Sequence, residues 1–126
     1  MVKGIGIDVV EIRRMEEVVS TWGSRFLNRV FTDTELEYAH ARKNPIYHIA
    51  GRFAVKEAVA KALATGWAKG FRWKDVEVNN DPAGKPSVRL RGVVEVLLAG
   101  SRVLVSISHS ESVVVATAII EAQESL

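Results

Sequence analysis

Short apolar runs alternate along this chain with segments whose apolar residues recur every three or four positions. Residues 3–10 form an apolar run that contains Gly4 and Gly6. We expect a strand there, and glycines inside a strand indicate that another backbone comes close. Residues 11–20 have the spacing of a helix, which Trp22 and Gly23 interrupt.

Two more helices are predicted before the middle of the chain. Residues 32–43 begin with Thr32 and Glu35, the T-x-x-E pattern of a capping box. A longer helix is predicted over 45–65, and Gly66 then suits the left-handed residue that ends many helices.

The second half of the chain predicts four strands and one short helix. In chain order they are a strand over 73–79, a strand over 86–91, a helix over 93–99, and strands over 102–108 and 113–120. Turn-forming residues over 81–86 and polar residues over 109–112 join neighbouring strands. The order β-α-α-α-β-β-α-β-β indicates an antiparallel sheet with packed helices, an α+β fold. We expect one domain over 1–126.

The composition is that of an ordinary globular domain and excludes several kinds of chemistry. Of 126 residues, 48% are hydrophobic and 25% charged, and none is cysteine. Disulfides, thiolate metal sites and thiol nucleophiles are therefore excluded. A net charge of +2 is too mild for a protein that coats nucleic acid. No apolar stretch approaches the roughly 18 residues of a membrane span, and no signal peptide is recognisable, so we expect an intracellular protein.

Helical spacing divides the helix over 45–65 into two faces. The apolar stripe, expected to face the core, consists of Val55, Ala58, Val59, Ala62 and Leu63. Phe53, Glu57 and Lys61 lie on the opposite side, where Glu57 and Lys61 form an i,i+4 pair typical of a solvent-exposed face. Phe53 does not suit such a face, so we expect a second surface to cover it, with another subunit as one candidate.

Asp8, near the end of the first predicted strand, has two interpretations. It is either the cap of the helix that starts near Glu11 or a hard oxygen ligand. Mg²⁺ takes one or two protein carboxylates, and Asp8 and Glu57 supply two if the fold brings them together. Sequence spacing leaves that condition open.

A polar cluster ends the strand over 102–108. Ser106, Ser108, His109 and Ser110 are either a turn with a structural histidine or part of a phosphate or nucleotide site. Their order identifies no Ser-His-Asp triad, and the three histidines show no zinc-ligand spacing.

Basic residues are frequent in the first third of the chain. They are Arg13, Arg14, Arg25, Arg29 and Arg42. Neighbouring glutamates make a mixed, solvated surface one interpretation, and a docking patch for a small acidic protein the other.

Four sequence blocks, taken together, resemble the holo-acyl-carrier-protein synthase family of phosphopantetheinyl transferases. The blocks are G-I-G-I-D over 4–8 followed by Ile12 and Arg14, R-F-A-V-K-E-A-V-A-K-A over 52–62, residues 73–78 followed by Gly84, Lys85 and Pro86, and S-I-S-H over 106–109. They occur in the family's order and cover essentially the whole chain. The pattern F-x-x-K-E-x-x-x-K in the second block is the most specific. One departure is Val113, where relatives often have an aromatic residue.

The resemblance implies the reaction, the assembly and the residues that serve them. A homotrimer with clefts between adjacent subunits would move 4'-phosphopantetheine from coenzyme A to a serine of apo acyl carrier protein, in the cytoplasm and for fatty acid biosynthesis, releasing adenosine 3',5'-bisphosphate. Asp8 and Glu57 match the ligands of Mg²⁺, and Glu57 and Lys61 match catalytic positions. The positions that match the coenzyme A site are Arg52, Lys61, Gly84, Lys85, Pro86, Ser108 and His109. Arg14 and Arg25 match positions that face the carrier protein, and Lys43 matches one near the nucleotide phosphates.

Two other functions stay open at the level of sequence. A small basic α+β domain is compatible with RNA binding through a sheet face, although Trp73 is its only suitably placed strand aromatic. A different magnesium-dependent phosphate enzyme, such as a small nucleotide hydrolase, is the third possibility.

Overall fold

The structure is a computed structural model, and it describes residues 1–64 and 70–123. The helices are α1 (Ile12–Trp22), α2 (Ser24–Val30), α3 (Asp33–His40), α4 (Pro45–Leu63) and α5 (Gly92–Leu97). The strands are β1 (Val2–Glu11), β2 (Val76–Asn80), β3 (Pro86–Leu90), β4 (Ser101–His109) and β5 (Val113–Ala122). The predicted α+β class and element order are confirmed, and α2 is an additional short helix that the apolar pattern did not reveal.

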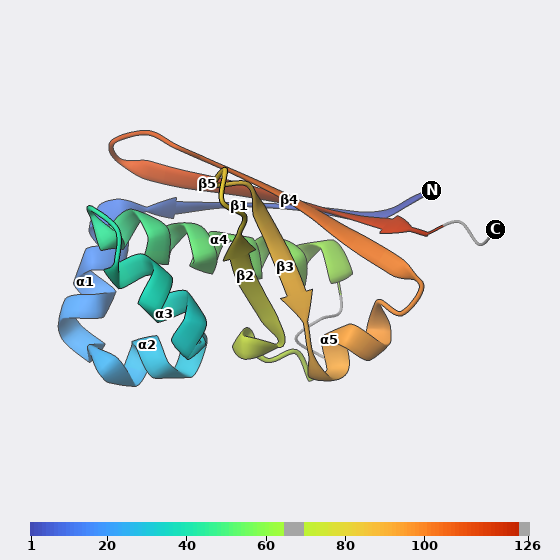
Figure 1. The fold of residues 1–126 in the computed structure, drawn as a ribbon, viewed down its shortest axis with the longest axis horizontal. Coiled ribbons are helices and arrows are strands. Elements are labelled where there is room, and N and C mark those ends of the chain that lie inside the picture. The colour runs from blue at the N-terminus through green and yellow to red at the C-terminus, as the bar shows by residue number, and fades with distance from the viewer. Residues whose placement is uncertain (65–69, 124–126) are drawn as a thin grey trace.

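Two antiparallel sheets enclose the long helix α4. A three-stranded sheet in the order β1-β5-β4 lies along one side of α4, and the β2-β3 hairpin packs on another side (Figure 1). Helices α1 to α3 gather at one end of α4. Helix α5 follows the end of β3 and lies away from these three helices (Figure 1). The core therefore surrounds α4.

Helix α4 is buried on more sides than its apolar stripe predicted. Four of the five stripe residues are buried and Leu63 is partly buried. Beyond the stripe, the helix also buries Ile49, Ala50, Gly51, Arg52, Ala54, Lys56 and Ala60. Small side chains make this possible because a helix rich in alanine can be approached closely from several directions. The face that carries Phe53, Glu57 and Lys61 remains the most accessible one, since Phe53 and Glu57 are partly buried and Lys61 is exposed.

Phe53 is covered by the chain itself. Its ring stacks on Trp73 with a centroid distance of 5.1 Å and an interplanar angle of 25°, and Phe26 lies 6.1 Å away on α2. The second covering surface that the sequence required is thus present without another subunit.

Several local signals are confirmed, and several element ends differ. Thr32 and Glu35 form the predicted capping box. Gly23, with φ of 52°, separates α1 from α2 at the predicted break. The predicted strand over 73–79 begins as a 3₁₀ turn over 73–75, because the Trp73 ring turns back onto α4. Helix α3 ends at His40 rather than near residue 43, and the predicted α4 end at 65–66 lies outside the described residues.

The glycines of β1 allow this strand to touch the backbone of α4, as the sequence indicated. A Cβ on Gly4 would collide with the carbonyl of Ala62, and one on Gly6 with the carbonyl of Ala58. Across the sheet Gly6 pairs with Ala118, and that alanine is fully buried.

Among the described residues, no helix is long and apolar enough to span a bilayer.

We expect Gly6→Ala to lower the free energy of unfolding by about 3 kcal/mol, since a backbone carbonyl cannot move aside as a side chain can. Gly51→Ala on α4 is the matched control. Its Cβ would lie at an ordinary 3.6 Å from the Ile107 side chain, so helix propensity predicts a gain of up to about 1 kcal/mol. Urea denaturation measures both. Equal effects of the two variants would contradict the close strand–helix contact.

Candidate active site

The last part of β1 places Asp8 beside α4. The Nζ of Lys61 lies 2.9 Å from Oδ1 of Asp8, and the same ammonium donates to the carbonyl of Ile7 at 3.0 Å. The Asp8 side chain is mostly buried, whereas that of Lys61 is half exposed. Helix α1 is preceded by Glu11 and has no side-chain cap, so the interpretation of Asp8 as a helix cap is wrong.

Glu57 is the second carboxylate at this place. Burial raises the pKa of Glu57 above its ordinary value of 4.5, the negative charge of Asp8 raises the pKa further, and Lys61 opposes both effects. The two carboxylates are thus close enough to repel each other, although 49 positions separate them in the chain. The fold therefore brings Asp8 and Glu57 together, which the sequence spacing alone left open.

Asp8 and Glu57 line a common cleft of about 460 Å³. Its remaining walls are formed by Val9, Val10, Glu11, Arg14, Met15, Val18, Phe26 and Phe53. The lining therefore combines apolar and aromatic side chains with the acidic pair. Such a cleft can hold an extended, partly apolar substrate beside a charged reaction centre.

The acidic pair suits a hard divalent cation. Among the described residues, no group of three or more His, Cys, Asp or Glu side chains forms a metal cage. Mg²⁺ does not need one, because one or two carboxylates usually hold it while water and substrate phosphates complete its shell. A bound cation would also favour the ionised form of Glu57, whose pKa is otherwise raised. The residues present therefore fit Mg²⁺.

A second group of predicted residues surrounds Arg52 on another face of α4. Arg52 is only 3% exposed, and its Nη2 donates to Oδ1 of Asn80 at 2.7 Å. Its guanidinium also lies 4.3 Å from the centroid of the Tyr38 ring. Burial lowers the pKa of Arg52, and the charge of Glu35 opposes that change.

Arg52 has unused hydrogen-bonding capacity. Within the described part of the chain, its Nε is buried and has no hydrogen-bond partner. Leaving a buried donor of a charged group unpaired is unfavourable. An arrangement of this kind is expected where an anionic ligand completes the site.

The second cleft, of about 320 Å³, joins Arg52 to the β2-β3 turn and the end of β4. Its lining includes Gly84, Pro86 and His109 together with Tyr38, Tyr47, His48 and Asn80. Asn80 donates to the carbonyl of Gly84 at 3.0 Å, so the same amide links Arg52 to the turn. Lys85 and Ser108 are exposed nearby in sequence, on the turn and on β4.

His48 and Tyr38 are site residues that the sequence did not single out. Burial lowers the pKa of His48, and the positive charges of Arg52 and Arg42 lower it further. His48 stands four residues before Arg52, one helical turn away, and this spacing was the available signal. Tyr38 lies on α3 and carried no comparable signal.

Comparisons with known proteins identify the family of this chain. The family model described as the 4'-phosphopantetheinyl transferase superfamily matches residues 4–118. The chain belongs to this superfamily. It is 50% identical over 109 residues to the holo-[acyl-carrier-protein] synthase of Protochlamydia amoebophila, covering 86% of this chain and 89% of that protein. It is 44% identical to the Halothermothrix orenii holo-[acyl-carrier-protein] synthase, covering 92% and 94%.

Solved structures of holo-(acyl-carrier-protein) synthases have the same fold as this chain. A holo-(acyl-carrier-protein) synthase from Bacillus anthracis in complex with CoA (3',5'-ADP) has a TM-score of 0.82 at 36% identity, covering 98% of this chain and 99% of that one. The Helicobacter pylori holo-[acyl-carrier-protein] synthase in complex with coenzyme A has a TM-score of 0.83 at 30% identity, covering 93% and 99%. The predicted family and enzyme class are confirmed: this chain is a phosphopantetheinyl transferase of the holo-[acyl-carrier-protein] synthase type.

In this phosphopantetheinyl transferase the residues predicted for one site occupy two clefts. Asp8 and Glu57 line the first cleft, with Lys61 bound to Asp8, whereas Arg52 and His109 line the second. Lys61 is therefore not gathered with the other residues predicted to line the coenzyme A site. The two clefts share no lining residue.

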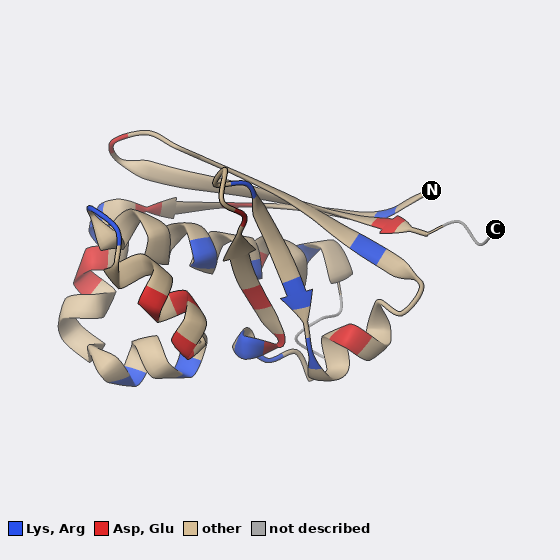
Figure 2. Ribbon diagram, viewed as in Figure 1, with Lys and Arg blue, Asp and Glu red and all other residues tan. Residues whose placement is uncertain are grey.

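The basic residues of the transferase lie among acidic ones. Arg14 lines the first cleft and Arg25 is exposed on α2. Arg13 and Glu17 are 3.7 Å apart on the same helix, and both charge signs occur on helices α1 to α3 (Figure 2). The mixed surface expected from the sequence is therefore present. Of the arginines on α1 and α2, Arg14 is the one that lines the cleft together with Asp8 and Glu57.

We expect Glu57→Gln to raise the melting temperature at neutral pH. Because the pKa of Glu57 is raised in the folded state, ionisation of Glu57 costs folding free energy once the pH exceeds the unfolded-state pKa, and glutamine removes that cost. The gain should shrink as the pH falls towards 4.5, the ordinary value. Calorimetry across this range measures it, with exposed Glu95→Gln as control. A lower melting temperature at pH 7 would contradict the unfavourable burial of this carboxylate.

Proposed function

We propose that this chain transfers 4'-phosphopantetheine from coenzyme A to a serine of apo acyl carrier protein in a reaction that needs Mg²⁺. The products are the holo carrier protein and adenosine 3',5'-bisphosphate. The meeting of Asp8 and Glu57 beside Lys61, in one cleft, carries the proposal. Membership of the transferase superfamily and the two relatives solved with coenzyme A or its nucleotide support it.

Asp8 and Glu57 would hold the cation on its protein side, and the diphosphate of coenzyme A would approach from the open side of the cleft. When bound, Mg²⁺ supplies charge neutralisation at the phosphates. Lys61, already held by Asp8 and half exposed, provides a positive charge for the departing phosphate. Phosphoryl transfer depends mainly on such positioning and charge stabilisation.

The nucleophile belongs to the carrier protein. Its serine hydroxyl attacks the phosphorus that bears the pantetheine arm, and the bond to the adenosine bisphosphate breaks. Glu57 would orient a water that takes the serine proton. The apolar walls at Val9, Val18 and Phe53 suit the arm itself. Arg14, at the rim of this cleft, and Arg25 on α2 are the proposed docking positions for the acidic carrier protein.

The second cleft would bind the adenosine bisphosphate part of coenzyme A. Arg52 has a buried donor to spare, and His109, Gly84 and Pro86 line the same space. We also propose that the rim of this cleft includes three exposed residues, Lys43, Lys85 and Ser108. Since acyl carrier protein carries the growing chain in fatty acid biosynthesis, we place the reaction in that pathway and in the cytoplasm.

A homotrimer would join the two clefts by setting the first cleft of one subunit against the second cleft of the next. The outer face of the three-stranded sheet supports association, since Ile5, Ile7 and Val9 are 69%, 56% and 57% exposed and Leu104 is 45% exposed. A contiguous apolar face of this kind marks an interaction surface.

Asp8→Asn and Glu57→Gln should each lower transfer on the order of 10²-fold or more, because each removes one of the two carboxylates proposed to hold the Mg²⁺ that neutralises the diphosphate. Mass spectrometry of an apo carrier protein incubated with enzyme, Mg²⁺ and coenzyme A measures the transfer, and calorimetric Mg²⁺ titration tests binding without turnover. Glu95→Gln, exposed on α5, is the control. Near-normal transfer by both site variants would end the metal proposal, and coenzyme A breakdown without an acceptor would indicate a hydrolase.

Mixing two inactive variants tests whether adjacent subunits share a site. Glu57→Gln damages the first cleft and His109→Ala the second, so neither variant alone should be active. In randomly mixed trimers, one interface in four joins two undamaged clefts, and about a quarter of the activity should return. Co-expression with distinct affinity tags supplies the mixed oligomers. Confirmed mixed trimers without recovered activity would show that each subunit builds its own site.

A further inference from the structure

A buried lysine next to Glu57 has no part in the proposed chemistry. Lys56 and Glu35 both have side chains that are 0% exposed, and Nζ of Lys56 lies 2.9 Å from Oε1 of Glu35. Burial lowers the pKa of Lys56, and the charges of Glu35 and then Glu77 oppose that change. The pair therefore stays together inside the protein, where a charge without a partner would be strongly unfavourable.

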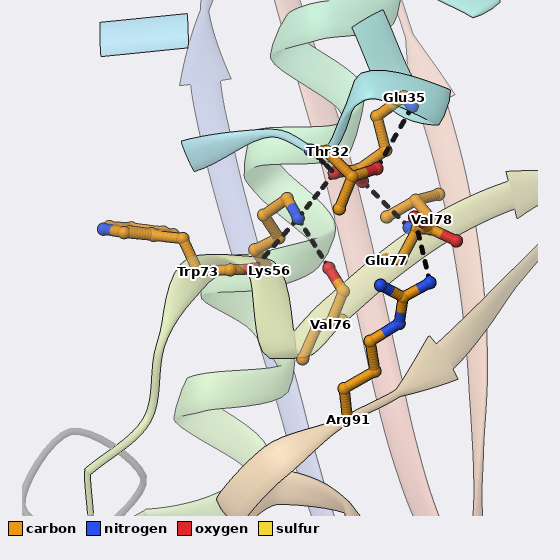
Figure 3. Close-up of polar contacts among 8 residues, drawn as sticks. All are labelled: Thr32, Glu35, Lys56, Trp73, Val76, Glu77, Val78 and Arg91. Carbon is orange, nitrogen blue, oxygen red and sulfur yellow. Dashed lines mark hydrogen bonds and ion pairs between the residues drawn. The ribbon is translucent and has the colours of Figure 1, made fainter. Parts of the chain in front are cut away.

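The polar capacity of this pair is almost fully used (Figure 3). Besides contacting Glu35, the Lys56 ammonium donates to the carbonyls of Trp73 at 3.0 Å and Val76 at 2.5 Å. A lysine has three N–H bonds, so each has one acceptor. Oε1 of Glu35 accepts from the backbone of Thr32, and its Oε2 accepts from the backbone of Val78, both at 2.9 Å.

These contacts tie three separate segments to one point of α4. Glu35 belongs to α3, Trp73 to the 3₁₀ turn and Val76 to β2, and all three meet at Lys56 (Figure 3). Oriented hydrogen bonds define distances and directions, which apolar packing of equal volume does not. The pair is therefore suited to fix where the segment over 73–76 begins.

The position of that segment matters for the first cleft. Lys56 holds the carbonyl of Trp73, and the ring of Trp73 stacks on Phe53 at 5.1 Å. Phe53 lines the cleft that also contains Asp8 and Glu57. A continuous path of contacts thus leads from the buried ion pair, through one stacked aromatic pair, to Phe53, which lies one helical turn before Glu57 and lines the same cleft.

We infer that Lys56, held by Glu35, is a positioning residue that sets the Trp73–Phe53 wall of the cleft and thereby the placement of Glu57 for transfer. The inference rests on the proposed function for its effect on turnover, but its effect on Trp73 is independent of any substrate. Stability alone does not require the charges, because apolar replacements of buried ion pairs are often neutral or stabilising. Directed bonds to two carbonyls are what the charged pair adds.

The decisive variant replaces both partners. Lys56→Met alone leaves Glu35 buried without its cation and is expected to fold poorly, so the double variant Glu35→Gln/Lys56→Met is compared with it. In the double variant we expect a folded protein whose kcat is reduced ten- to a hundredfold while KM for coenzyme A changes little, since small displacements of a reaction centre have effects of this size.

Trp73 fluorescence measures the wall directly. In a Trp22→Phe/Trp67→Phe background, Trp73 is the only tryptophan left of three. The double variant should shift its emission to longer wavelength and increase its quenching by acrylamide. The control is Arg13→Gln/Glu17→Gln, which removes an ion pair of 3.7 Å on α1 that has no contact with Lys56 or Trp73 among the described interactions. The control should leave emission and kcat unchanged.

Each outcome decides the inference. Unchanged Trp73 emission in the folded double variant overturns it, and so does a shift in emission with wild-type kcat. Equal losses in the control variant would reduce Lys56 to a general structural role and also overturn it. If the parent protein shows no transfer at all, the proposed function fails, whereas the fluorescence comparison still shows whether Lys56 holds Trp73.

Discussion

The contact between the backbone of β1 and the backbone of α4 is the constraint on which the site depends. Gly4 and Gly6 face Ala62 and Ala58 so closely that neither strand position has room for a Cβ. Alternation along the strand directs Asp8 to the same side as these glycines. Where the glycines end, the first side chain that reaches α4 is therefore a carboxylate. The contact that closes the core also delivers Asp8 to Lys61 and Glu57.

Three charged residues of α4 are buried or partly buried, and they differ in how completely their charges are paired within the chain. Lys56 is completely paired and has no access to solvent. Glu57 is left beside another carboxylate with a raised pKa, and Arg52 keeps a buried N–H without a partner among the described residues. A paired charge fixes structure, whereas charges that are poorly compensated within the chain are best compensated by a ligand. The distribution of unsatisfied charge thus separates the structural residue from those that face substrate.

On the proposed function, the two clefts would bind different parts of coenzyme A. The first combines an acidic pair with apolar walls, and the second combines a buried guanidinium with histidines and a glycine turn. A cation and a pantetheine arm suit the former, and anionic phosphates suit the latter. Both clefts are built on α4 but on different faces of it, so in the proposed homotrimer one coenzyme A would span clefts of two adjacent subunits.

The sequence alone determined the α+β class, most element positions, the capping box at Thr32 and the meaning of the β1 glycines. These follow from periodicity and backbone geometry, which are local. Four sequence blocks taken together also identified the family and nominated Asp8, Glu57 and Lys61. Helix α2 was missed because one short helix carries little periodic signal.

Only the tertiary structure decided what the nominated residues touch. The Lys61–Asp8 pair spans 53 positions, the Trp73 ring covers Phe53, and Lys56 contacts Glu35 on another helix. Periodicity showed one apolar stripe on α4 but not that neighbours would bury its other faces. Such contacts depend on how separate elements pack, and packing is a property of the whole chain rather than of any window within it.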